Sequence, residues 1–196
     1  MAVGHRLTRR AALGLMLAGC ARVQLDALPE PQGAPVTASS RLRVVFFEVS
    51  GTSVPFHTGL IVHTPQTLLI YDPAGKWRPS TLPYHRDGDT FRDVSPAFEE
   101  AYLIRDGIRY FPHTWRTHVF DVGVTPEIGQ RALDRVNSSE LALPLHCAYA
   151  VSTVLSGLPG FEDIEPHRIT TVLFDALLLR DDVTYSRREP QDPQNG

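Results

Sequence analysis

Two residues of this sequence, Cys147 and His57, are of the types that together form a thiol nucleophile. Cys147 follows Pro144 by three positions and lies at the start of an apolar segment, residues 146–156, whose length suits a helix. A thiol at a helix N-terminus has a lowered pKa, because the peptide dipoles and free N–H groups of the first turn favour a thiolate. The same N–H groups could stabilise an oxyanion. The alternative is a buried, inert thiol, since free cysteines are among the most buried residues in proteins.

A general base for Cys147 must be a histidine that the fold can bring to this helix start. His57 begins a predicted strand, and Gly59 beside it has no side chain to obstruct a neighbour. His63 points to the same face of that strand but would lie about 20 Å away. His146 is interpreted as a helix-start residue. Four further histidines are expected to be solvated: His85, His113, His118 and His167.

The elements that must position these residues are short and are bounded by proline and glycine. β-Branched and aromatic runs predict strands over residues 42–50, 57–63, 68–72 and 116–122. Capping patterns and apolar spacing predict helices over residues 95–105, 125–137 and 146–156. Residues 76–93 read as a long loop, and residues 169–179 as an element that could be helix or strand. A β-meander with separate helices predicts an α+β fold.

Two of these segments resemble the NlpC-like papain-fold cysteine hydrolases. Residues 56–62, Phe-His-Thr-Gly-Leu-Ile-Val, resemble the histidine strand of that family, and Cys147 resembles its nucleophile at a helix start. The usual family order places cysteine before histidine, whereas here His57 precedes Cys147 by ninety positions. This order matches the circularly permuted branch, which includes lecithin:retinol acyltransferase-like proteins and several bacterial lipoproteins. The resemblance covers roughly residues 42–160 and implies an antiparallel sheet packed against the cysteine-bearing helix.

The resemblance implies a hydrolase (a thiol protease or amidase) or an acyltransferase. Cys147 would attack an amide, ester or thioester carbonyl while His57 transfers the proton. Residues 69–73, Leu-Ile-Tyr-Asp-Pro, resemble the next family strand, whose third catalytic residue is commonly His, Asn or Gln; this chain offers Tyr71 and Asp72. A hairpin two residues longer than usual would place Tyr71 opposite His57. We favour Asp72, because a carboxylate orients an imidazole and stabilises its charge, although Asp72 could instead cap the turn that follows.

The N-terminus has the pattern of a bacterial lipoprotein signal peptide, residues 1–19. A basic stretch precedes an apolar run that is too short to span a bilayer, and Leu-Ala-Gly-Cys ending at Cys20 resembles a lipobox. That resemblance implies cleavage before Cys20 and its acylation, for example with palmitate. The protein would then be anchored to a membrane of the bacterial cell envelope facing the periplasm, with the outer membrane favoured over the inner. A plain secretory signal is the alternative, and Thr8-Arg9-Arg10 leaves Sec and twin-arginine export both open.

The remaining sequence predicts one domain on a tether. Residues 20–40 are the anchor cysteine and a flexible linker, residues 41–186 a single permuted papain-like domain, and residues 187–196 a disordered tail. The formal net charge of −3 gives no reason to expect nucleic acid, and no later apolar run is long enough to span a membrane. No cofactor is expected. The expected partners are an envelope peptide or acyl substrate and the membrane, with the oligomeric state left open.

Two other functions are compatible with these patterns. The first is a catalytically inactive, lipid-anchored binding or scaffold protein on the same fold, since fold does not fix function. The second is a metal site, which we disfavour because the paired spacing of strong zinc motifs is missing. The loop residues 76–78 could line a substrate cleft or be ordinary surface. The metal site would be built from Cys147, His146, His57 and His63.

Overall fold

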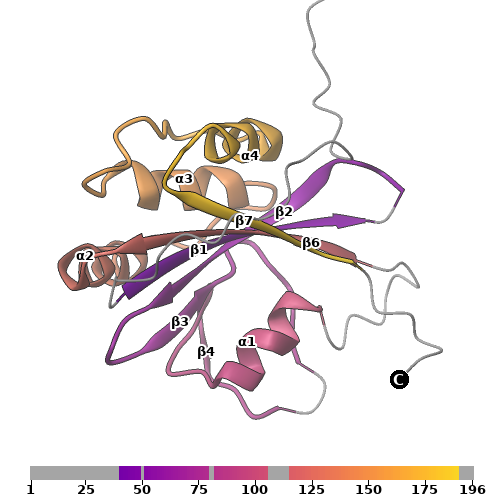
Figure 1. Ribbon diagram of the computed structural model, residues 1–196. Coiled ribbons are helices and arrows are strands. Elements are labelled where there is room, and N and C mark those ends of the chain that lie inside the picture. Colours follow the sequence, from indigo (N-terminus) through magenta and orange to yellow (C-terminus); the bar gives the residue numbers. More distant parts are fainter. Residues whose placement is uncertain (1–39, 50, 80–81, 106–114, 190–196) are drawn as a thin grey trace, which may run out of the picture.

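The computed structural model describes residues 40–49, 51–79, 82–105 and 115–189. Across these ranges the chain forms one antiparallel sheet of seven strands, in the order β4-β5-β3-β2-β1-β6-β7, with four helices. The fold is therefore α+β, as the sequence predicts. Strand β1 is an interior strand of the sheet, between β2 and β6 (Figure 1).

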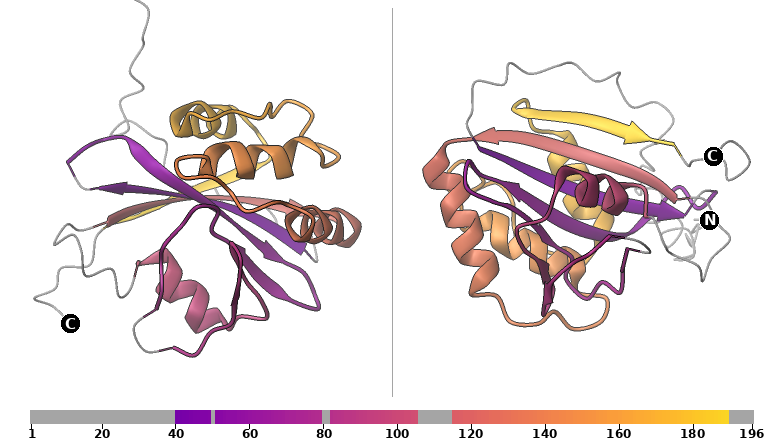
Figure 2. Two further views of the ribbon diagram at one scale, coloured as in Figure 1. Left: turned by 180° about the vertical axis from the view of Figure 1, so that it is seen from behind. Right: turned by 90° about the horizontal axis from the view of Figure 1, so that it is seen from below.

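The bounds of the elements follow the chain. The strands are β1 (Ser40–Val49), β2 (Pro55–His63), β3 (Leu68–Tyr71), β4 (Arg86–Asp87), β5 (Thr90–Phe91), β6 (Trp115–Val124) and β7 (Val183–Arg188). The helices are α1 (Pro96–Leu103), α2 (Pro126–Asn137), α3 (Cys147–Ser156) and α4 (Thr170–Leu178). Helices α2, α3 and α4 lie on one side of the sheet and α1 on the other (Figures 1 and 2).

Both faces of the central sheet are buried, which explains the nearly continuous apolar run of β1. Phe46 points into the core beneath the three helices, where it makes edge contacts with Phe120 and Phe174. Its neighbour Phe47 points into a second core beneath α1, against Tyr102. Successive side chains of a strand face opposite sides, so one strand supplies both cores.

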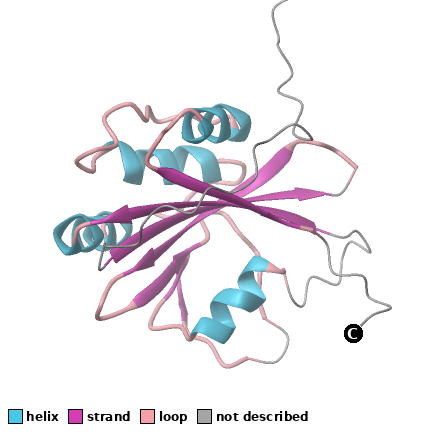
Figure 3. Cartoon of the chain, viewed as in Figure 1, coloured by secondary structure: helices cyan, strands magenta, loops and turns pink. Residues whose placement is uncertain are grey.

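The helices begin where the sequence places their caps. Ser95 accepts a hydrogen bond from the backbone of Phe98 at the start of α1, and Thr125 accepts one from Ile128 at the start of α2. Each cap is followed by a proline at the first helical position, where a missing N–H leaves nothing unpaired. These capping predictions are confirmed, as are the predicted strands and helices to within a few residues (Figure 3).

Three regions differ from the sequence-based expectations. Residues 169–179, left open between helix and strand, form the helix α4, whose leucines pack into the core. The expected long loop contains the short strands β4 and β5. The sequence assigns Arg187 and Arg188 to a disordered tail. In the structure both belong to β7, which pairs with the free edge of β6. That edge has unsatisfied backbone groups, and pairing outweighs the polar composition of residues 183–188.

The start of the domain is also shifted by one residue. Ser40, assigned to the linker by the sequence, already pairs with Val124 in β1. The predicted signal peptide, Cys20, the rest of the linker and residues 190–196 lie outside the described residues. In the part of the chain that is described, no helix has the length and apolarity needed to cross a bilayer.

Helix α4 offers a matched test of this packing. Leu177 is fully buried, whereas Leu179, two positions later, is 85% exposed. We expect Leu177→Ala to lower the free energy of unfolding by about 2–5 kcal/mol, because it leaves a cavity in the core. Leu179→Ala should change the free energy by no more than about 0.5 kcal/mol. Urea denaturation followed by circular dichroism measures both, and equal effects would contradict this orientation of α4.

Candidate active site

The candidate site lies at the end of β3. The first part of β2 extends past this point and has no β3 residue beside it. The β2–β3 ladder runs from the pair His63 and Leu68 to the pair Leu60 and Tyr71, and stops there. The first residues of β2 therefore pair with β1 alone, His57 standing opposite Phe47. The side of β2 that faces away from β1 is thus open at His57. Asp72 directly follows the end of β3.

His57 and Asp72 form a buried hydrogen-bonded pair. The Nε2 atom of His57 lies 2.7 Å from Oδ1 of Asp72, and the Asp72 side chain is fully buried. Burial would lower the pKa of His57, but the charge and hydrogen bond of Asp72, together with a hydrogen bond to Cys147, raise it overall. Burial would raise the pKa of Asp72, yet His57, Arg105 and Tyr102 hold it far below its usual value. The pair therefore favours an imidazolium next to a carboxylate.

Cys147 is the first residue of α3 and lies against this pair. Burial would raise the pKa of its thiol, but the hydrogen bond and charge of His57 lower it overall, assisted by the backbone N–H groups of Thr58 and Ala148. Because Asp72 occupies Nε2 of the ring, Nδ1 is the nitrogen left for the sulfur. The residue is 5% exposed, so the sulfur is nearly covered. The structure thus brings Cys147, His57 and Asp72 together, although ninety positions separate the first two.

Tyr71 and Asp72, the two candidates for the third catalytic residue, have different surroundings. Tyr71 stands opposite Leu60 and points into the core beneath the helices, where burial raises the pKa of its phenol. It does not face His57, and the longer hairpin that would have placed it there is absent from the β2–β3 register. Asp72 also takes part in a turn: its carbonyl accepts a hydrogen bond from Gly75 N–H at 2.9 Å. The backbone carbonyl of Asp72 thus bonds Gly75, while its carboxylate bonds His57.

Sequence reasoning missed the residues that enclose Asp72 from the far side. Tyr102, on α1, is fully buried and its hydroxyl donates to Oδ1 of Asp72 at 2.8 Å. Burial and the charge of Asp72 raise the pKa of Tyr102 well above its usual value, so the phenol remains a donor. Arg105, just beyond α1, places Nη1 3.8 Å from the same oxygen. Nothing in the local sequence near these residues signals a contact with a turn thirty positions earlier.

Two glycines make room for this arrangement. A Cβ atom at Gly59 would lie 2.2 Å from the hydroxyl of Tyr102, and one at Gly75 would lie 1.8 Å from Oδ2 of Asp72. Both distances are far shorter than non-bonded atoms allow. The sequence pointed to Gly59 as a position that must not obstruct a neighbour, but its neighbour is Tyr102. The role of Gly75 was not foreseen.

His63 and His146 have partners other than the three site residues. His63 hydrogen-bonds Glu99 at 3.0 Å, toward the far end of β2, and His146 makes a ring contact with Tyr149. Within the described ranges, no group of three or more His, Cys, Asp or Glu side chains is arranged to hold a metal ion. The four residues of the alternative metal site are therefore not arranged to hold an ion together. His113 lies outside the described residues.

His118 corrects the expectation that it is solvated. It is fully buried, with Nε2 2.9 Å from Glu48 Oε2 and Nδ1 2.9 Å from the hydroxyl of Tyr185. Burial lowers the pKa of His118, despite the hydrogen bond and charge of Glu48. Because both ring nitrogens are already occupied, this cluster ties β1, β6 and β7 together and presents no free base.

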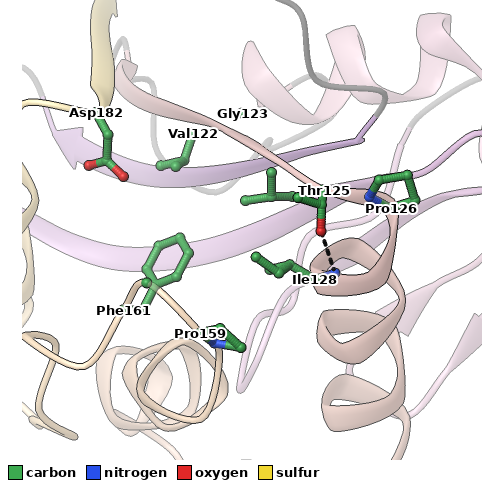
Figure 4. Close-up of a pocket in the computed structure, with 10 residues that line it drawn as sticks. Val122, Gly123, Thr125, Pro126, Ile128, Pro159, Phe161 and Asp182 are labelled. Carbon is green, nitrogen blue, oxygen red and sulfur yellow. Dashed lines mark hydrogen bonds between the residues drawn. The ribbon is translucent and has the colours of Figure 1, made fainter.

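A separate cavity lies at the other end of the sheet. It has a volume of about 440 Å³ and is lined by the end of β6, the start of α2 and the segment after α3, with Thr125, Phe161 and Asp182 among its residues (Figure 4). None of the three candidate site residues lines it. Trp77, in the loop expected to border a substrate cleft, is buried in the core beneath α1. These features place the reactive groups at the open edge of β2 and not in this cavity.

Comparisons with known proteins add no family assignment. No protein-family model, no curated protein and no solved structure matches the chain.

The close packing at Gly75 generates a test of the His57–Asp72 pair. Gly75→Ala places a methyl group on Oδ2 of Asp72 and should push the carboxylate away from His57. We expect the pKa of His57 to fall by about one unit and the pKa of Cys147 to rise, because each loses part of its charge partner. NMR titration of ¹³C-labelled histidine and thiolate absorbance measure the two values. Leu179→Ala, an exposed position remote from the site, is the control and should shift neither.

Proposed function

We propose that this protein is a thiol hydrolase or acyltransferase that acts on an amide, ester or thioester bond. The observation that carries the proposal is the buried His57–Asp72 pair, 2.7 Å apart, beside Cys147 at the N-terminus of α3, whose thiol pKa His57 lowers. In the proposed roles Cys147 is the nucleophile, His57 the general acid and base, and Asp72 the residue that orients the imidazole. The proposed reaction needs no cofactor.

The proposed chemistry proceeds in two steps. The Cys147 thiolate attacks the substrate carbonyl carbon, and collapse of the tetrahedral intermediate expels the leaving group, which takes its proton from the His57 imidazolium. Water or an acceptor alcohol or amine then attacks the resulting thioester, while His57 removes its proton. The second attack releases the acyl product and restores the thiol. Hydrolase and acyltransferase differ only in the nucleophile of this second step.

The start of α3 supports stabilisation of the oxyanion. The first intrahelical bond runs from Ala150 N–H to the His146 carbonyl, so the N–H groups before Ala150 have no partner four residues back. No side chain caps this end. Free N–H groups and the positive end of the helix dipole favour a developing negative charge beside the sulfur.

The architecture supports a circularly permuted papain-like fold of the NlpC type, which we propose for this chain. A histidine strand precedes the cysteine helix, and α3 packs on β2, as the resemblance implies. The surroundings of the thiol also favour an apolar group on the substrate. Leu143 and Leu145, four and two residues before Cys147, are 63% and 87% exposed, and Phe56 beside His57 is 51% exposed. The proposed substrate is an envelope peptide or acyl compound.

The proposal predicts a thiol that reacts at low pH. The pKa of Cys147 is lowered and that of His57 is raised, so the thiolate should persist below the pH at which an ordinary thiol is protonated. We expect iodoacetamide to alkylate Cys147 at pH 6 about tenfold faster than free cysteine, whose pKa is about 8.5. His57→Ala should remove this excess. Peptide mass spectrometry after timed labelling measures the rate at Cys147.

A second readout separates an enzyme from an inactive scaffold on the same fold. Incubation with p-nitrophenyl acetate should release nitrophenol and leave an acetyl group on Cys147, and Cys147→Ser and Asp72→Asn should each abolish or strongly slow this step. Leu179→Ala, a surface change remote from the site, is the matched control. If Cys147 reacts no faster than free cysteine and takes up no acyl group, the scaffold function is favoured and the enzyme function is wrong.

We further propose that the protein is a lipoprotein of the bacterial cell envelope, attached through acylated Cys20 to a membrane facing the periplasm, with the outer membrane favoured. The proposed tether would join the described domain at a point remote from the candidate site. Strand β1 begins at Ser40, whereas His57 stands opposite Phe47 near the other end of β1. Seven residues of strand separate these points by about 23 Å. No nucleic-acid partner is proposed.

Replacement of the lipobox cysteine tests this proposal. In a bacterial host, we expect the wild-type chain to sediment with membranes and to incorporate labelled palmitate, because acyl chains contribute about 0.8 kcal/mol per buried CH₂ group. Cys20→Ser should abolish the label and release the protein into the soluble fraction. Cys147→Ser, which removes the other thiol, is the control and should still be labelled. Membrane attachment without label in the wild type would contradict the anchor.

A further inference from the structure

A second layer of residues encloses Asp72 from the side opposite His57. It comes from the end of α1, and its two polar members are Tyr102 and Arg105. The phenol of Tyr102 donates to Oδ1 of Asp72 at 2.8 Å, and Nη1 of Arg105 lies 3.8 Å from that oxygen. Both side chains are buried, the Arg105 side chain being only 4% exposed. This layer does not touch the thiol and has no role in the reaction proposed above.

The backbone of Arg105 shows that its position is constrained. It follows Ile104, the last residue of the α1 cap, and has a φ of 55°, in the left-handed region where glycine is usual. A non-glycine residue there is held by its surroundings at a cost of about 1 kcal/mol. The side chain explains why arginine is present. Its guanidinium lies 3.4 Å from the ring centroid of Phe47 and reaches Asp72 from there.

A purely structural role would not need this charge. Nε of Arg105 has no hydrogen-bond partner, and neither has Oδ2 of Asp72. Both buried groups therefore have an unsatisfied polar atom. Burying such groups is unfavourable unless they compensate each other. Gly59 is needed as well, because any side chain at that position would displace the Tyr102 hydroxyl. The chain therefore accepts several local costs to keep this layer against Asp72.

The charges balance in each state of the proposed reaction. Asp72 is negative and Arg105 positive, and the remaining pair, Cys147 and His57, is neutral in sum both as thiolate with imidazolium and as thioester with neutral imidazole. Arg86 on β4 also lies near Asp72, with its Nη1 4.0 Å from Oδ2 and its Nη2 3.8 Å from Asp89. Without Arg105 the buried cluster would carry an extra negative charge, which would hold the proton on His57.

We propose that Tyr102 and Arg105 are positioning residues, which fix Oδ1 of Asp72 toward His57 and offset its charge so that the imidazolium can release its proton. The part of this proposal that concerns proton release rests on the proposed thiol chemistry. The charge effect itself does not, because it can be measured without a substrate. The positive charge of Arg105 repels a protonated His57 and lowers the pKa of the histidine. This repulsion supports a role for Arg105 in helping the imidazolium to release its proton.

Arginine substitutions test the proposal through the pKa of His57, measured by NMR titration of ¹³C-labelled histidine in the full-length protein. The His57 signal is assigned with His57→Ala. In Arg105→Gln the pKa should rise by about half a unit or more, because an opposing positive charge is removed. Arg105→Lys keeps the charge and should restore a value near the wild type. Tyr102→Phe removes a donor but no charge, so it should slow alkylation of Cys147 several-fold with a smaller change in pKa.

The control is Arg188→Gln, which removes an exposed arginine that pairs with Glu100 on α1. It should leave the pKa of His57 unchanged. If Arg105→Gln does not fold, Arg105→Gly carries the same expectation, because glycine relieves the backbone strain at this position. An unchanged or lowered pKa in a folded variant would overturn the proposal, as would unfolding of both variants while Arg105→Lys folds. Low reactivity of Cys147 in the wild type would count against the proposed function alone, and the pKa comparison would still stand.

Discussion

The structure around the candidate site depends on one buried charge, the carboxylate of Asp72. Its side chain has no exposed area, and an ion in such a place must find partners within the protein or lose its charge. His57, Tyr102 and Arg105 supply those partners from β2 and α1. His57 comes from the sheet, whereas Tyr102 and Arg105 come from the end of α1. The charge of Asp72 thus links the edge of the sheet to the helix beneath it.

The asymmetry of the sheet creates the room for this cluster. Because β3 is short, β2 loses its outer neighbour before His57, and the chain turns away at Asp72 where a longer hairpin would have continued the ladder. The helix α3 brings its N-terminus to the open edge, while its apolar side chains pack on the sheet. A longer β3 would pair with the first residues of β2 and close this edge. The length of one strand therefore decides whether Cys147 can meet His57.

Local patterns in the sequence predict the elements and part of the site. Cys147 could be placed at a helix start from Pro144 and the apolar run, and His57 at a strand start from its neighbours. Asp72 could be proposed but not chosen with certainty over Tyr71, because one residue of register moves a side chain to the other face. Tyr102 and Arg105 could not be found, since their contact with Asp72 depends on how α1 packs beneath the sheet. The strand β7 was missed for a similar reason: its pairing partner lies about sixty-five positions earlier in β6.

The distribution of local strain bears on the choice between an enzyme and an inert domain. In the described part of the chain five non-glycine residues have positive φ, and three of them adjoin the site: Ala74 in the turn after Asp72, Arg105 beyond α1, and Leu145 before Cys147. Of the seven buried side-chain atoms without hydrogen-bond partners among the described residues, two lie in this cluster, on Asp72 and Arg105. Such departures from local preference are unfavourable and tend to cluster where function requires a particular geometry. An inert core around a free cysteine would have no need of them, because apolar residues of similar volume would pack there without a buried charge to compensate.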